Sequence, residues 1–200
     1  MARSTRESIL TAAAELMRHR GYGAVGMKDI AAASGAPIGS LYHHFRGGKV
    51  QIAREALINS GQAYALLIPS IVAEYTDLGD AIDRVFNQAA EDMAGTGFAN
   101  MCPVASVAAE TADTVEELRE TSASVFQGWV DGGSAYFASR GLDPAQAREM
   151  TLALIGALEG AFVLARTLRS TEPLLAAGRA LAPRYRGVTL ASHVKTPVRG

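Results

Sequence analysis

The stretch GAPIGSLYHHF, residues 35–45, places Gly35, Pro37 and Gly39 within five positions and follows them with a leucine and a run of rings. Glycine and proline weaken the interior of a helix, so an ordinary core helix is not built from this composition. Gly35 permits a sharp turn because it lacks a side chain, and Pro37 suits the first turn of a helix, where its missing N–H is no loss. We therefore expect a tight turn and then a short helix that serves a purpose outside the core.

Two helices are predicted before this turn. Ser4 and Glu7 have the spacing of a capping box, apolar residues follow at helical intervals, and Gly21 supplies a stop. The segment MKDIAAAS, residues 27–34, is a second, short helix that ends at Gly35. A helix, a glycine turn and a short helix form the layout of the helix-turn-helix motif, whose second helix enters the major groove of DNA. The first 45 residues are thus predicted to hold three helices and a DNA-reading element.

The predicted third helix has an inward side and an outward side. At about 100° per residue, Leu41 and Phe45 fall on one side and anchor the helix in a core. A glycine on the opposite side lets the backbone approach phosphates, a serine hydroxyl donates to a base or a phosphate, and a tyrosine ring contacts thymine methyl groups. The outward or flanking positions are Gly39, Ser40, Tyr42 and His43. A plain helical hairpin with an aromatic core remains the alternative for this stretch taken alone.

Charge is spread unevenly along the chain, although the net charge is only −1. Residues 1–50 carry seven basic and three acidic side chains, whereas residues 77–120 carry ten acidic and two basic ones. A basic segment suits a polyanion, so this asymmetry favours nucleic-acid binding at the N-terminal end.

The segment GYGAVGMKDIAAASGAPIGSLYHHFRGGKVQIAREAL, residues 21–57, resembles the N-terminal domain of the TetR family of one-component transcriptional regulators. Three later segments are similar to the LmrA/YxaF-type subgroup of that family, and they extend the resemblance to about residue 182: MCPVASVAAETAD (101–113), LRETSASVFQGW (118–129) and LALIGALEGAFVLAR (152–166). The resemblance implies a ligand-responsive, homodimeric transcriptional repressor. Such a protein binds a palindromic operator in double-stranded DNA and is released by a small, aromatic or drug-like effector.

By position, the resemblance implies that Lys28 and Lys49 contact DNA phosphates. It also places six residues of the third helix at or near the DNA: Ile38, Gly39, Ser40, Tyr42, His43 and His44. The chain departs from the family's pattern at Val25 and Gly26, where Ser or Thr is usual, and at Ile38, where a basic or polar residue is common. The missing hydroxyl removes a phosphate contact and a good helix cap, so we expect modest affinity for each half-site.

Only helical patterns follow, and no segment alternates with a period of two for long enough to be a strand. The predicted helices span residues 48–70, 79–94, 103–110, 114–139, 144–169 and 172–182, with breaks at DLGD, GTGFANMCP and RGLDP. The expected fold is therefore all-α, with a three-helix helix-turn-helix domain and a larger helical domain for ligand binding and dimerisation. We place the first over residues 1–47, the second over 48–182, and a loose tail over 183–200.

The predicted helix 144–169 is apolar nearly all round, which means that both of its sides are covered. Its small side holds a stripe of Ala153, Ala157 and Gly160, with Gly156 and Leu164 beside it. Its larger side holds Ile155, Leu158 and Phe162. The family's four-helix dimer interface implies that the small side meets a second copy of the chain and that the larger side faces its own domain. A helix buried wholly within one chain is the alternative.

A ligand cavity is expected in the larger domain. Its predicted apolar walls are Phe86, Met101, Val104, Val107, Phe126, Trp129 and Phe162, each of which would serve equally as plain core. Glu159 and Arg166 lie seven residues apart near the larger side of their helix, and buried charges need partners. They are predicted to be polar anchors for a ligand; the alternatives are a structural ion-pair network or an exposed edge of the helix.

The competing function class, an all-helical enzyme or small-molecule carrier that uses the same cavity, finds little support in the sequence. The GGK at residues 47–49 lacks the first glycine and the following Ser or Thr of a phosphate loop, and the adjacent His43 and His44 lie on different faces of a helix, which makes them poor joint metal ligands. Cys102, the single cysteine, is read as a small buried hydrophobe. We expect no cofactor, no bound metal and no catalysis, because neither a Ser/His/Asp order nor paired carboxylates are evident. No signal-peptide pattern and no run of about eighteen apolar residues occurs, so we expect a cytoplasmic protein without a membrane span.

Overall fold

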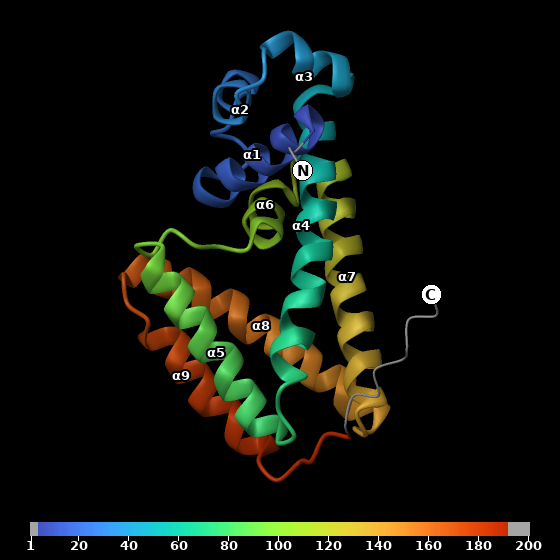
Figure 1. Ribbon diagram of the computed structural model, residues 1–200, viewed down its shortest axis with the longest axis vertical. Coiled ribbons are helices and arrows are strands. Elements are labelled where there is room, and N and C mark those ends of the chain that lie inside the picture. Colours follow the sequence, from blue (N-terminus) through green and yellow to red (C-terminus); the bar gives the residue numbers. More distant parts are fainter. Residues whose placement is uncertain (1–3, 192–200) are drawn as a thin grey trace. The chain divides into compact units, whose positions relative to one another are not determined.

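The computed structural model describes residues 4–191 of the chain, and helices make up most of them (Figure 1). They are α1 (Thr5–Arg20), α2 (Met27–Ser34), α3 (Ile38–His44), α4 (Gly48–Val72), α5 (Leu78–Gly95), α6 (Pro103–Thr111), α7 (Glu116–Ser139), α8 (Pro144–Leu168) and α9 (Glu172–Leu181), followed by a short 3₁₀ helix (Ala182–Tyr185). An isolated antiparallel bridge joins Asp77 to Thr189, and no named strand occurs among the described residues. The predicted all-α fold is confirmed.

The nine α-helices found within residues 4–191 lie where the sequence predicts them, with boundaries that differ by at most two residues. One detail differs, since Pro37 precedes α3 as its N-cap instead of occupying its first turn.

Local capping explains where several helices begin and end. At the start of α1 the Ser4 hydroxyl accepts a hydrogen bond from the N–H of Glu7, and the Glu7 carboxylate accepts one from the N–H of Ser4. Gly35 ends α2 with φ of 69°, a left-handed conformation that favours glycine. Asp143 begins α8 by accepting from the N–H of Ala145 at 2.9 Å. These short-range contacts are the reason that the helix boundaries follow from the sequence.

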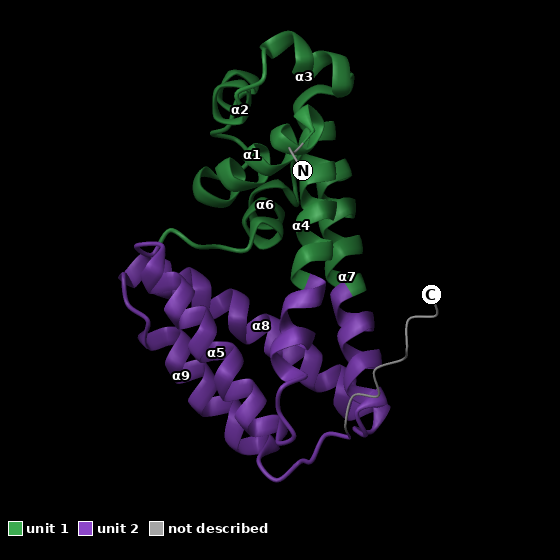
Figure 2. Ribbon diagram, in the orientation of Figure 1, with its two compact units in different colours: residues 1–64, 99–128 green, residues 65–98, 129–200 purple. Residues whose placement is uncertain are grey.

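The described chain packs into two compact units, which Figure 2 colours separately. Unit 1 runs to residue 64 and takes in residues 99–128, and unit 2 holds residues 65–98 and the chain from residue 129. Helices α4 and α7 each contribute to both. The predicted domain boundary at residue 47 separates the expected DNA-binding domain from the expected domain for ligand binding and dimerisation. It stays a prediction.

Unit 1 is built around contacts among α1, α2 and α3, with α6 packed against α1. Its fully buried side chains come from every one of these helices and from the first part of α4, and they include Ile9, Met17, Ile30, Leu41, Phe45, Ile52, Val104 and Val107. This small core supports the three helices that the sequence assigns to DNA reading.

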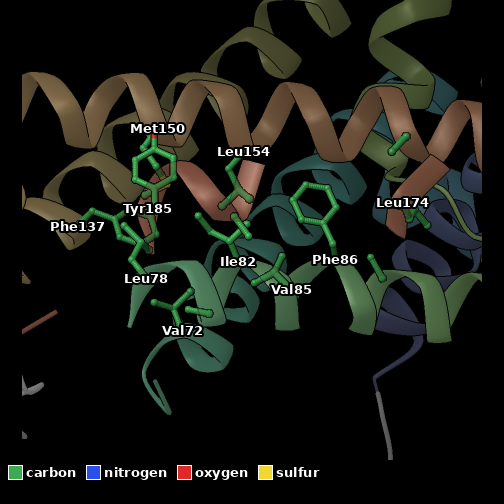
Figure 3. Close-up of a cluster of buried hydrophobic side chains, with 14 of the residues drawn as sticks. Val72, Leu78, Ile82, Val85, Phe86, Phe137, Met150, Leu154, Leu174 and Tyr185 are labelled. Atoms are coloured by element: carbon green, nitrogen blue, oxygen red, sulfur yellow. The ribbon is translucent and has the colours of Figure 1, made fainter. Parts of the chain in front are cut away.

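Unit 2 has its own larger core, in which α5 packs against α8 and α9. Figure 3 shows Ile82, Val85 and Phe86 of α5 beside Leu154 of α8. Gly178 of α9 allows a close approach, because a Cβ at this position would lie 2.8 Å from the Cβ of Phe86. Burial of these apolar side chains is the main source of stability for the unit.

The chain after α9 differs from the loose tail predicted over residues 183–200. Leu190 is buried, and its N–H donates to the carbonyl of Thr76 at 2.7 Å. The N–H of Leu78 in turn donates to the carbonyl of Val188. Residues 183–191 are therefore packed and hydrogen-bonded, because they complete the backbone pairing of the segment that precedes α5. Residues 192–200 of the predicted tail lie outside the described residues.

Arg140, at the end of α7, holds this C-terminal segment in place. Its side chain is 2% exposed, its Nε donates to the carbonyl of Ala191, and its Nη2 donates to the carbonyl of Tyr75 at 3.1 Å. Nη1 donates to the Tyr136 hydroxyl at 2.7 Å. A buried guanidinium requires such acceptors, and the contact with Ala191 ties it to the packed segment.

Helix α8 buries one side and exposes another. The core side consists of Ala147, Met150, Thr151, Leu154, Ala161 and Ala165. The exposed side includes Leu152, Gly156, Gly160, Val163, Leu164 and Leu168. The predicted faces are therefore rotated about the helix axis: Ala153 and Ala157 are half-buried flank residues, and Ile155, Leu158 and Phe162 are half-buried instead of central to the core. Among the predicted small-side residues, Gly156, Gly160 and Leu164 lie on the open face.

Candidate nucleic-acid interface

Helix α3 is anchored by two residues one turn apart. Leu41 and Phe45 have no exposed surface, and α3 contacts both α1 and α2. The guanidinium carbon of Arg6 lies 5.1 Å from the centre of the Phe45 ring, which gives that ring a cationic neighbour as well. The predicted inward side of α3 is confirmed, so its opposite side is directed away from the protein.

The opposite side of α3 presents a short, mixed surface. Ile38 is 42% exposed and Tyr42 is 55% exposed, which is unusual for large apolar and aromatic side chains in a small core domain. Gly39 and His43 are exposed as well. A Cβ added at Gly39 would meet no atom within 4 Å, so this part of the helix backbone is openly accessible.

Two other predicted contacts on α3 are partly covered. Ser40 and His44 are half-buried. The His44 ring lies edge-on to the rings of His43 and Phe45, at centroid distances of 5.2 and 6.4 Å. These residues therefore flank the exposed surface instead of forming its centre.

The predicted phosphate-binding lysines have different surroundings. Lys28 on α2 is exposed. Lys49, at the start of α4, is half-buried with its Nζ 4.0 Å from the centre of the Tyr22 ring. Burial lowers the pKa of Lys49, while the carboxylates of Glu110 and Asp29 act in the opposite direction.

Arg46 is a candidate contact that sequence reasoning missed. It follows the anchor Phe45 directly and is exposed. Among the described arginines of unit 1, Arg46 is the one with no carboxylate within ion-pair distance. Each of the others has a partner: Arg6 pairs with Glu55, Arg18 with Glu15, Arg20 with Asp29, Arg54 with Glu117, and Arg119 with Glu116 and Glu120. The position of Arg46 directly after Phe45 can be read from the sequence. Its lack of an ion-pair partner cannot, because that depends on how the other arginines pair in the fold.

The departures from the family's pattern before α2 have local consequences. Val25 is fully buried, so it belongs to the core and not to the surface. Gly26 caps α2 without a side chain, and the Asp29 carboxylate accepts a hydrogen bond from its N–H at 2.7 Å. One free N–H of the helix start is thereby satisfied from inside the helix.

The predicted ligand-binding residues are divided between the two units. Met101, Val104, Val107 and Phe126 belong to unit 1, whereas Phe86, Trp129, Glu159, Phe162 and Arg166 belong to unit 2. Phe86, Met101, Val104 and Val107 are buried, and the remaining five are half-buried. Their part in ligand binding stays a prediction. A surface groove of about 640 Å³ in unit 1, lined by residues of α1 and α2, contains none of them.

Two further features bear on the kinds of function that are possible. Within residues 4–191, no group of three or more His, Cys, Asp or Glu side chains is placed to hold a metal ion. Helix α8 is long and apolar enough to cross a membrane by length and composition alone, a test that core helices also pass. One face of α8 is apolar and exposed, with Leu152, Leu164 and Leu168 each at least half exposed.

Comparison with known families and proteins matches both parts of the chain. Residues 9–59 match the family described as bacterial regulatory proteins, tetR family. Residues 79–180 match the transcriptional regulator LmrA/YxaF-like C-terminal domain.

Individual proteins agree with these matches. The chain is 34% identical to the uncharacterized HTH-type transcriptional regulator Rv0196 of Mycobacterium tuberculosis, over 84% of this chain and 88% of that protein. It is 32% identical to the HTH-type transcriptional regulator LmrA of Bacillus subtilis, over 86% of this chain and 91% of that protein. The crystal structure of regulatory protein TetR from Rhodobacter sphaeroides has the same fold, with a TM-score of 0.78, 23% identity, and coverage of 90% of this chain and 98% of that chain.

Proposed function

Since the chain belongs to the TetR family of bacterial transcriptional regulators, with an LmrA/YxaF-like C-terminal domain, we propose that it is a cytoplasmic, homodimeric repressor that binds a palindromic operator and is released by a small molecule. The family consists of DNA-binding regulators and not of enzymes. The observation that carries the DNA-binding part is the division of α3 into a buried anchor, Leu41 and Phe45, and an exposed side that includes Ile38 and Tyr42.

The proposed contacts follow from this division. Ile38, Tyr42 and His43 would meet base edges, and the accessible backbone at Gly39 would approach a phosphate. Lys28, Arg46 and Lys49 would neutralise phosphates on either side of the groove. Ser40 and His44 flank these contacts. The test is retardation of promoter DNA from the gene's own neighbourhood by the purified protein, with unrelated DNA of the same length as competitor.

The role of Arg46 gives a quantitative prediction. Arg46→Ala should weaken binding to operator and unrelated DNA alike, and should reduce the slope of log K against log salt by about one per half-site, because one phosphate contact is lost. Arg119→Ala on α7 removes the same charge from an arginine paired with Glu116 and is the matched control. Fluorescence anisotropy over a salt series measures both slopes. Equal slopes for Arg46→Ala and the parent would remove Arg46 from the interface.

The exposed face of α8 supports the proposed dimer. Leu152, Val163, Leu164 and Leu168 are each at least half exposed, and Gly156 and Gly160 lie between them. A row of apolar side chains with glycines between them permits close approach of a second helix. Exposure of such a surface to water is unfavourable, so its burial against a partner is favoured. A second copy of the chain presenting the same face would cover it.

The effector is proposed to be flat, and aromatic or drug-like, and Trp129 supplies the probe. A true effector should change Trp129 fluorescence and release operator DNA over matching concentrations. Operator DNA must weaken effector binding by the same factor, because linkage is reciprocal. Phe126→Ala should lower effector affinity and spare DNA affinity. We propose that a shift of α4 changes the separation of the two recognition helices away from the one-turn multiple, about 34–36 Å, that successive major grooves require.

Titrating a panel of planar aromatic compounds with the protein, with and without operator, decides this point. A compound that binds near Trp129 and leaves operator affinity unchanged is not an effector. If no compound couples the two sites, the protein is a constitutive DNA-binding dimer.

A further inference from the structure

We propose that Glu110 of α6 is a positioning residue for Lys49, and that it acts through the turn between α1 and α2. The inference rests on the proposed DNA-binding function, in which Lys49 contacts a phosphate. It adds a residue that lies far from α3 in the sequence and that does not itself touch DNA.

The Glu110 carboxylate holds two consecutive backbone groups of the turn. Its Oε2 accepts from the N–H of Tyr22 and its Oε1 accepts from the N–H of Gly23, both at 2.6 Å. Charge-assisted hydrogen bonds of this length are stronger than neutral ones. A Cβ at Gly21 or at Gly23 would lie 2.5 Å from a carboxylate oxygen. The two glycines therefore leave the space that the carboxylate occupies.

The same turn carries the ring that receives Lys49. The Lys49 Nζ lies 4.0 Å from the centre of the Tyr22 ring, which is within the range of a cation–π contact. Burial and then the charge of Glu110 raise the pKa of Tyr22 above its ordinary value, which favours the neutral phenol. Fixing the backbone of Tyr22 thus limits where the ammonium of Lys49 is held at the start of α4.

Contacts other than those of Glu110 also hold α6 and the residues before it in place. The Ser106 hydroxyl donates to the carbonyl of Met17 at 3.4 Å, and Arg18 Nη1 donates to Asn100 Oδ1 at 3.0 Å. The buried Val104 and Val107 also hold α6 in the core of unit 1. Loss of the Glu110 contacts should therefore release the turn and leave the fold of the unit intact.

Glu110→Gln tests the proposal through the sign of its effect. Removing a negative charge from a DNA-binding unit favours DNA binding by simple electrostatics. Loss of positioning predicts the opposite result, because the glutamine amide offers one acceptor oxygen and turns an NH₂ group toward a backbone donor. We expect operator affinity to fall about tenfold, within the usual range of coupling between sites. The salt slope should fall by about one per half-site as the Lys49 contact is lost.

Gly23→Ala disrupts the same contact from the other side. Gly23 is outside the left-handed region, so alanine is compatible with the backbone, and its Cβ must displace the flexible carboxylate. We expect the same loss of affinity, and no further loss when the two changes are combined. Glu120→Gln on α7 removes an equal charge from an exposed residue and is the matched control. Thermal melting of each variant checks the fold.

Two DNA-binding results would overturn the proposal. One is a Glu110→Gln protein that binds operator as tightly as the parent or more tightly. The other is a loss that is undiminished in the Lys49→Ala background. If the parent itself binds no DNA, the proposed function fails, and NMR still decides the positioning: the ring-current shift of the Lys49 ε-methylene protons should disappear in Glu110→Gln, and its persistence would overturn the role of Glu110.

Discussion

Gly160→Leu is expected to convert the proposed dimer into monomers and to lower operator affinity by about 10²-fold or more, because two linked half-site contacts become independent. Gly160 lies on the exposed face of α8, and a Cβ there would meet no atom of its own chain within 4 Å. The protomer therefore accommodates a leucine. Any loss of assembly must come from the surface of the partner copy, which the larger side chain would push away.

Sedimentation velocity measures the assembly, and anisotropy with operator DNA measures the affinity. Gly95→Leu is the matched control, because Gly95 is also an exposed helical glycine of unit 2 with open space at its Cβ, but lies at the end of α5. It should leave the dimer unchanged. A Gly160→Leu protein that sediments as the parent does would place the dimer interface on another face.

Tyr42→Ala is expected to cost about 1–3 kcal/mol of operator binding at each half-site, because one good base contact is lost from each recognition helix. The change in unfolding free energy should stay within about 0.5 kcal/mol, as for other surface substitutions, since more than half of this side chain is exposed. Discrimination against a substituted base pair should also shrink at one position of each half-site.

The neighbouring residue supplies the contrast for this experiment. Leu41 is fully buried, so Leu41→Ala should lower the unfolding free energy by about 2–5 kcal/mol and reduce DNA binding through loss of structure. Competition with operator variants and thermal melting separate the two causes. Unchanged operator affinity in Tyr42→Ala would mean that α3 reads DNA through other side chains or is not the recognition helix.

The helices and their order were predictable because their signals are local. Capping residues such as Ser4 and a left-handed glycine such as Gly35 act within a few positions, and the side of α3 that holds Leu41 and Phe45 follows from its period. The buried and exposed sides of α8 were predicted less well. Because α8 carries apolar side chains on every face, its sequence has no polar side that would mark the exposed face. Which residues are buried therefore depends on the side chains of α5 and α9 that pack against it.

Contacts between distant parts of the chain were not predictable from single residues. The Glu110 carboxylate meets the backbone of Tyr22 and Gly23, which lie nearly ninety positions earlier, and backbone donors leave no trace in composition. The packing of residues 183–191 was missed for the same reason, since its acceptors and donors belong to the segment before α5 and to Arg140. That Arg46 lacks an ion-pair partner could be recognised only from the structure, which shows the carboxylates that pair with the other arginines, such as Glu55 with Arg6 and Glu117 with Arg54.

In α3, different residues support the fold and face outward, and this affects how the sequence specificity of the protein can change during evolution. The side chains that support the fold, Leu41 and Phe45, are different from those that face outward, Ile38 and Tyr42, and Gly39 has open space around it. Substitutions at the outward positions therefore carry little penalty in folding stability, and in the proposed function they change mainly which promoter sequence is bound. A duplicated gene would be able to acquire a new set of target genes through a few changes in one turn of helix, while its scaffold stays the same.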